Sequence, residues 1–179
     1  MFNKSLLKNV VLYGFLAGLL TMIYCYVLYA NGAVPLDGKK APTILLSMVC
    51  MILSVKSYRK VNPDHTLHFW EGLVVANLTN LIGALVSAIA LYFWLSGSGS
   101  SILSTYISES IQTLQIATVK AGYVKEMGEA SFKELIDAFR ILSPKNIAFD
   151  EVVGLKGKFP LGVLISIMIS LYFRRGYVN

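Results

Sequence analysis

Residues 72–95, "GLVVANLTNLIGALVSAIALYFWL", are the longest apolar segment of this chain. It contains no charged residue, and Trp70 and Trp94 stand near its two ends. A helix from Trp70 to Trp94 is about 36 Å long at about 1.5 Å per residue. Because Trp side chains gather at both membrane–water interfaces, this spacing predicts a transmembrane helix over residues 70–95.

Three further apolar segments predict transmembrane helices. Residues 10–30 carry no charge and span about 30 Å, one hydrocarbon core. They exceed the apolar core of a signal peptide, so we expect this helix to be retained. Residues 41–58 and 159–173 are shorter, and basic residues near their ends can reach the headgroups.

Composition agrees with these four segments. Hydrophobic residues make up 55% of the 179-residue chain and charged residues only 15%, against about 25% charged in a soluble domain. We therefore expect an all-α membrane protein with four transmembrane helices. An amphipathic helical hairpin is expected between helices 3 and 4, all within a single integral membrane domain.

The basic residues lie mainly at the ends of the apolar segments. The net charge is +6, but Lys and Arg form no groove-sized stripe, so we expect no nucleic-acid partner.

The two termini and the turn over residues 56–71 carry the larger share of basic residues in short loops, which predicts a multi-pass inner (plasma) membrane protein with both termini in the cytoplasm. Its main partner is the lipid bilayer. The expected interface anchors are Tyr58, Arg59, Trp70, Trp94, Arg174 and Arg175.

Small and weakly polar residues recur at three- and four-residue spacing in every apolar segment. In a bilayer the hydrophobic effect does not drive helices together. Helix association therefore depends on close packing, which small residues allow because they let the backbones approach. These stripes predict a compact four-helix bundle. The residues expected to pack its helices together are Gly14, Gly18, Asn80, Gly83, Ser87, Gly162 and Ser166.

Two amides, Asn77 and Asn80, lie within the third segment, and an amide in hydrocarbon needs hydrogen-bond partners. One interpretation is an interhelical hydrogen bond. The other is a polar face that lines a pathway or binds a headgroup, which would make the protein a small oligomeric transporter or channel. We expect no acidic residue inside a span, which counts against a proton-coupled pump.

Residues 96–158 are too long for a turn, and their apolar residues follow a helical period. In the clearest helix, Ser131 and Glu134 form a capping box and Pro144 marks the end. The apolar faces of this insert can pack on each other or on a second copy, lie on the membrane surface, or bind another membrane protein. The expected docking face consists of Phe132, Leu135, Ile136 and Phe139.

The turn between the second and third segments holds both histidines, His65 and His68. One hypothesis is a metal-dependent membrane enzyme that uses them. However, their spacing differs from the His-Glu-x-x-His pattern of zinc enzymes, the preceding Asn-Pro-Asp is a turn signal, and Asp64 or Thr66 can cap the next helix. We interpret the stretch as a turn and expect no metal, no cofactor and no catalytic residue.

Several of these stretches resemble a known family. The glycine-bearing first span, "SYRK" ending the second, "LHFWEG" before the third, "GVLISIMISLYFRR" in the last and the amphipathic insert are similar to the domain of unknown function 4199 family. The resemblance covers nearly the whole chain and implies a small bacterial multi-span inner-membrane protein. It implies no activity and carries over no catalytic residue. We therefore expect a non-enzymatic structural or accessory subunit that docks partners through the insert.

Overall fold

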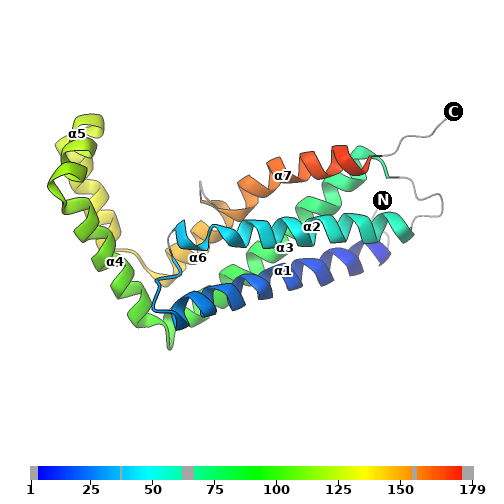
Figure 1. Ribbon diagram of the computed structural model, residues 1–179, viewed down its shortest axis with the longest axis horizontal. Coiled ribbons are helices and arrows are strands. Elements are labelled where there is room, and N and C mark those ends of the chain that lie inside the picture. Colours follow the sequence, from blue (N-terminus) through cyan, green and yellow to red (C-terminus); the bar gives the residue numbers. More distant parts are fainter. Residues whose placement is uncertain (1–3, 37, 62–66, 155–156, 175–179) are drawn as a thin grey trace.

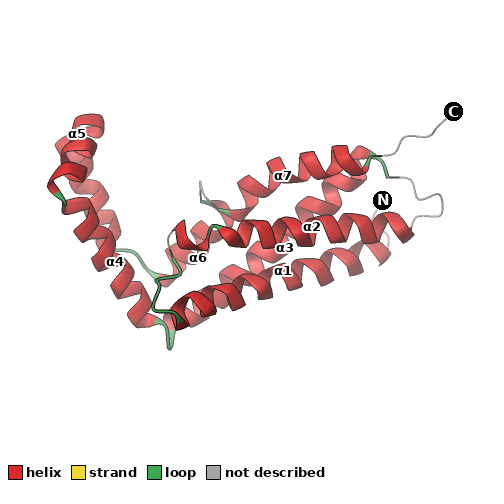
Figure 2. Cartoon of the chain, in the orientation of Figure 1, coloured by secondary structure: helices red, strands yellow, loops and turns green. Residues whose placement is uncertain are grey.

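The computed structural model describes residues 4–36, 38–61, 67–154 and 157–174, and nearly all of these residues are helical, as Figure 2 shows. It contains four helical segments long and apolar enough to cross a membrane, so the expected all-α fold is confirmed. In chain order the helices are α1 (Lys4–Ala30), the short 3-10 helix η1 (Gly38–Lys40), α2 (Pro42–Val61), α3 (Phe69–Ser96), α4 (Ser100–Gln115), α5 (Ala117–Arg140), α6 (Pro144–Val153) and α7 (Lys158–Phe173).

The long helices form a bundle around α3, which contacts α1, α2, α6 and α7. The start of α1, the end of α2 and the end of α7 lie at one end of the bundle, and α4 leaves from the other end (Figure 1). With four crossings, the start of α1 and the end of α7 therefore face the same side of a membrane.

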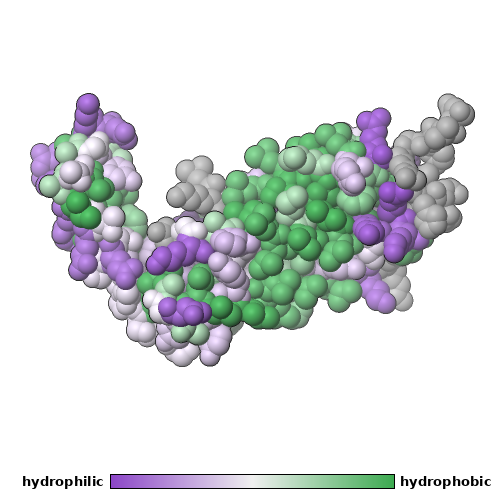
Figure 3. Space-filling model, in the orientation of Figure 1, coloured by the Kyte–Doolittle hydropathy of each residue, from purple (hydrophilic) through white to green (hydrophobic). Residues whose placement is uncertain are grey.

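Apolar side chains cover much of the outside of the bundle. Figure 3 shows them between hydrophilic residues at the end where α1 begins and at the end where α4 leaves. Leu12 and Phe15 of α1 and Met168 of α7 are among the exposed ones. A soluble monomer rarely exposes a large contiguous apolar surface, so contact with lipid accounts for this one.

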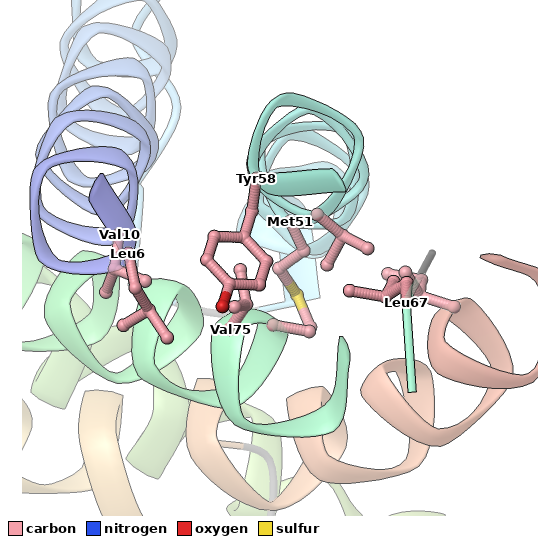
Figure 4. Packing of buried hydrophobic residues seen from close by; sticks show 9 residues of the cluster. Leu6, Val10, Met51, Tyr58, Leu67 and Val75 are labelled. Carbon is pink, nitrogen blue, oxygen red and sulfur yellow. The ribbon is translucent and has the colours of Figure 1, made fainter. Parts of the chain in front are cut away.

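The buried core has two parts, one toward each end of the bundle. Where α1 begins, Val10 of α1 and Tyr58 of α2 belong to one cluster (Figure 4). At the other end, Leu95 of α3 packs in a cluster with Ile102 of α4 and Ile147 of α6. The second cluster joins the segment between the third and fourth crossings to the bundle.

Glycines lie where α1 meets α3. A Cβ atom added to Gly14 would lie 2.7 Å from Ile82 Cβ, and one added to Gly18 would lie 2.5 Å from Val86 Cγ1. From the other side, a Cβ atom on Gly83 would lie 3.2 Å from the carbonyl oxygen of Gly14. The two backbones therefore approach at a distance that larger residues would prevent.

The fourth crossing is an interrupted helix, whereas a single short helix over residues 159–173 was expected. α6 and α7 together form the candidate span Pro144–Phe173. α6 ends at Val153, and a Cβ atom added to the following Gly154 would lie 2.7 Å from the carbonyl oxygen of Asp150. α6 and α7 together therefore provide the length of one membrane-spanning segment.

The segment between the third and fourth crossings forms a helical arm of α4 and α5. The two helices contact each other, and the arm extends away from the bundle in Figure 1. α5 bends at Gly128, whose φ of 84° and ψ of 161° are not helical and suit a glycine. The arm is shorter than the expected insert of 96–158, because α6 packs on α3 and belongs to the bundle.

We expect Gly14→Ala to lower the free energy of unfolding by about 1–3 kcal/mol, because the added methyl group overlaps Ile82 and the backbone of α3. The matched control is Gly122→Ala in α5, where nothing lies within 4 Å of the added Cβ atom. Alanine there favours the helix by up to about 1 kcal/mol. Unfolding in detergent micelles measures both variants, and equal effects would contradict the close contact of α1 with α3.

Candidate functional site

Lys158, the first residue of α7, has a buried ammonium group beside the helix break. Its side chain is 5% exposed. The Nζ atom donates hydrogen bonds to Thr21 Oγ1 at 2.6 Å and to Ser87 Oγ at 3.2 Å, and it lies 3.2 Å from Glu151 Oε1. An ammonium group has three donors, so α1, α3 and α6 supply one acceptor each.

Glu151 of α6 links Lys158 to a second lysine. Its Oε2 atom accepts a hydrogen bond from Lys40 Nζ at 2.6 Å, and Ser87 Oγ lies 3.3 Å from its Oε1 atom. The Glu151 side chain is 5% exposed, while that of Lys40, at the end of η1, is 26% exposed. We call Lys40, Glu151 and Lys158 the ion cluster.

The ion cluster combines two ammonium groups with one carboxylate. Burying a charge is unfavourable unless it is paired and hydrogen-bonded, and both charges of the inner pair, Glu151 and Lys158, meet this condition. Lys40, which supplies the excess positive charge, can still reach water. The cluster therefore ties η1, α1, α3, α6 and α7 to one another without an unpaired charge at its centre.

Two asparagines of α3 hold α7 beside the ion cluster. Asn80 Nδ2 donates a hydrogen bond to the carbonyl oxygen of Lys158 at 2.9 Å, and Asn77 Nδ2 donates one to Ser166 Oγ at 2.7 Å. The Asn80 amide occupies the space that a Cβ atom on Gly162 would take. Both amides therefore form interhelical hydrogen bonds, as the first of the two interpretations expects.

A small cavity adjoins the ion cluster. It measures about 10 Å³, and its lining includes Asn80, Lys158 and Gly162. That volume is close to the minimum for one water molecule. Since the ammonium protons of Lys158 are already directed at acceptors, the geometry favours a clamp between helices over a substrate site.

The expectation that no acidic residue enters a span is wrong for Glu151, which lies within the fourth candidate span. One signal in the sequence points to the pair. Glu151 and Lys158 are seven residues apart, a spacing that places two residues on one side of a helix, and Gly154 and Gly157 stand between them.

The expected aromatic anchors take different positions. Trp70 is exposed near the start of α3, and the ring of Trp94 near its end packs edge-on against Tyr29 of α1, with centroids 5.7 Å apart. The positions of Trp70 and Trp94 near opposite ends of α3 agree with the expectation that their rings lie at the two membrane interfaces. Tyr58, in contrast, is buried in the core because α2 turns it toward the bundle.

The expected basic anchors lie at one end of the bundle. Arg59 is half-buried in the last turn of α2, and Arg174 is exposed directly after α7. Arg175 lies outside the described residues. Arg59 and Arg174 therefore lie at the end of the bundle where α1 begins.

The face expected to dock partners packs inside the arm. Phe132 is buried, and the ring of Phe139 lies 6.4 Å from that of Tyr106 on α4. Leu135 and Ile136 are half-buried. Phe139 therefore contacts the neighbouring helix of the arm, as the self-packing alternative expects.

The turn that carries the histidines is described only in part, and His65, Asp64 and Thr66 lie outside the described residues. His68 is the N-cap of α3, and its backbone N–H donates a hydrogen bond to Glu71 Oε2 at 3.0 Å. Glu71 therefore serves the start of the helix. Within the described ranges, no three His, Cys, Asp or Glu side chains are grouped as a metal site requires.

The sequence matches the family described as "Protein of unknown function (DUF4199)" over residues 12–175. The chain belongs to this family. The match covers the four crossings and the arm together, so the resemblance expected from the sequence is confirmed. No curated protein and no solved structure matches the chain.

In this DUF4199 protein, we expect Glu151→Leu to lower the free energy of unfolding by about 3–5 kcal/mol, because it leaves the buried ammonium of Lys158 without its carboxylate. The double variant Glu151→Leu/Lys158→Met removes both charges and should recover most of that loss. Asp150→Leu, at an exposed neighbouring position of α6, is the matched control and should have little effect. A double variant no more stable than Glu151→Leu would contradict the inner ion pair.

Proposed function

We propose that this protein is a non-enzymatic accessory subunit of a membrane assembly, and that its helical arm binds the partner. The observation that carries the proposal is the arm itself. α4 and α5 contact each other, while contacts with the bundle are concentrated near the start of α4. Two amphipathic helices held outside the bundle expose surface that the bundle does not need for its own stability.

Both ends of the arm are fixed. At the first end, Ile102 and Leu103 of α4 are buried with Leu95 of α3. At the second end, α6 follows the arm and is fastened by Ile147 in the same cluster and by Glu151 in the ion cluster. An arm anchored at both ends loses less conformational freedom on binding than a free linker, which favours docking.

The outer surface of the arm offers its own apolar residues. Ile116, Tyr123 and Met127 are exposed by 53%, 38% and 39% of their surface. Tyr123 and Met127, four residues apart, lie on one side of α5 ahead of the bend at Gly128, and Ile116 directly precedes this helix. We propose this outer face as the docking surface, with the expected four residues, including Phe132, keeping the arm folded behind it.

The proposed location is the inner membrane, with the start of α1 and the end of α7 in the cytoplasm. Lys56, Arg59, Lys60 and Arg174 gather at this end of the bundle, as the positive-inside rule requires of cytoplasmic ends. The arm would then lie on the outer side of the membrane. A partner would be a membrane protein or a segment exposed on that side.

The test places a photoreactive amino acid at Tyr123 in native membranes. We expect a crosslink to a different membrane protein, and we expect Tyr123→Glu/Met127→Glu to abolish co-purification of that protein by adding charge to an apolar contact. The matched control is Ala121→Glu/Lys125→Glu, which adds two glutamates four residues apart at exposed positions on the opposite side of the same helix. A probe at Leu12, which faces lipid, should capture no protein.

Two outcomes would contradict the proposal. Capture of only another copy of this chain would make the arm a self-association surface. Co-purification that survives Tyr123→Glu/Met127→Glu, with the arm still helical by circular dichroism, would show that the partner binds elsewhere.

A further inference from the structure

A groove of about 330 Å³ opens between α3 and α6 on the side of the bundle that carries the arm. It lies within the range of about 300–1,000 Å³ that small-molecule sites occupy. Its lining is almost wholly apolar, with one charged side chain. The residues that matter here are Ile89, Tyr92 and Phe93 of α3 and Lys145, Ala148 and Phe149 of α6.

The groove has a deep apolar end and a shallow basic end. α6 runs antiparallel to the outer part of α3, because Ile147 packs with Leu95 while Glu151 reaches Ser87, two turns deeper. Lys145, near the start of α6, therefore lies nearest the interface. The groove thus has the polarity of a lipid molecule, with a cation at headgroup level and apolar walls below it.

Lys145 is available to a ligand. Its side chain is exposed, and it makes no ion pair with any described residue. The start of α6 adds to the positive potential, because backbone N–H groups of the first turn point outward. Ser143 caps this turn by accepting a hydrogen bond from the backbone N–H of Asn146, which fixes the helix start beside the lysine.

We propose that the groove between α3 and α6 binds one anionic phospholipid of the arm-side leaflet, with its phosphate at Lys145 and an acyl chain against Ile89, Phe93 and Phe149. Three large apolar side chains at the groove are widely exposed: Ile89 by 57%, Phe93 by 69% and Phe149 by 66%. Because they face the bilayer, the ligand can enter sideways from the leaflet.

Charge selects among the lipids. Zwitterionic headgroups carry their own cation beside the phosphate, which offsets the attraction of Lys145. An anionic headgroup such as phosphatidylglycerol has no such cation and keeps the full attraction. A bound lipid would also bridge α3 and α6, so it would add to the contacts that hold the second end of the arm.

Native mass spectrometry of the full chain in detergent tests the site with phosphatidylglycerol and phosphatidylcholine of identical acyl chains. We expect one phosphatidylglycerol to bind more tightly than phosphatidylcholine. Lys145→Gln should weaken phosphatidylglycerol binding about fivefold, the usual contribution of one basic residue near an anionic surface, and should leave phosphatidylcholine binding unchanged. Lys120→Gln on the arm is the matched control and should preserve the preference.

A second variant tests the apolar part of the groove without changing charge. Ala148→Phe fills the groove and should reduce binding of both lipids, whereas Phe15→Ala, on the exposed face of α1, should not. Inorganic phosphate at the same concentration should not displace the lipid, because it lacks the acyl chain. Equal binding of the two lipids, or a phosphatidylglycerol preference that persists in Lys145→Gln, would overturn the proposal.

Discussion

An interrupted helix inside a bilayer must find partners for its polar groups within the protein, because hydrocarbon offers none. At the break of the fourth crossing, Asn80 of α3 donates a hydrogen bond to the backbone carbonyl of Lys158, and the Lys158 ammonium finds acceptors on α1, α3 and α6. These acceptors come together only when the helices are assembled in this arrangement. Since a buried ion pair contributes little net stability compared with apolar packing, we infer that it specifies which helices pack together.

The same break explains how a short apolar segment serves as a full crossing. α7 alone has 16 residues, and a helix of that length spans about 24 Å. α6 supplies the remaining depth and also carries the chain from the arm into the bundle. Three sets of contacts therefore hold α6 and α7 in the bundle, where the chain returns from the arm. They are the ion cluster, the hydrogen bonds of Asn77 and Asn80, and the apolar cluster around Leu95.

Four apolar segments were predictable because lipid constrains both the length and the composition of a spanning helix, but the contribution of α6 to the fourth crossing was not. Residues 72–95 show this most clearly, and the close approach of Gly14 to α3 follows from the need for small residues at helix contacts.

The ion cluster was not predictable in the same way. Lys40 is 111 residues from Glu151 and Thr21 is 137 residues from Lys158, and a single sequence carries no sign of such proximity. Asn80 donates its hydrogen bond to a backbone carbonyl. Since every residue has a backbone carbonyl, the sequence does not indicate which one Asn80 contacts. The apolar face around Phe132 was predicted from the helical spacing of its residues. That spacing does not show which part of the protein, or which other molecule, packs against the face.

In this arrangement the chain crosses the membrane four times, and the arm lies on the side opposite the ends of α2 and α7. Labelling of single engineered thiols with a membrane-impermeant maleimide tests it most directly, in a chain whose Cys25 and Cys50 are replaced by alanine. Lys60→Cys, Ala130→Cys and Arg174→Cys report the end of α2, the arm and the end of α7. We expect position 130 to react in intact cells and positions 60 and 174 to react only after permeabilisation. Reaction of 130 on the same side as 60 or 174 would contradict the four-crossing arrangement.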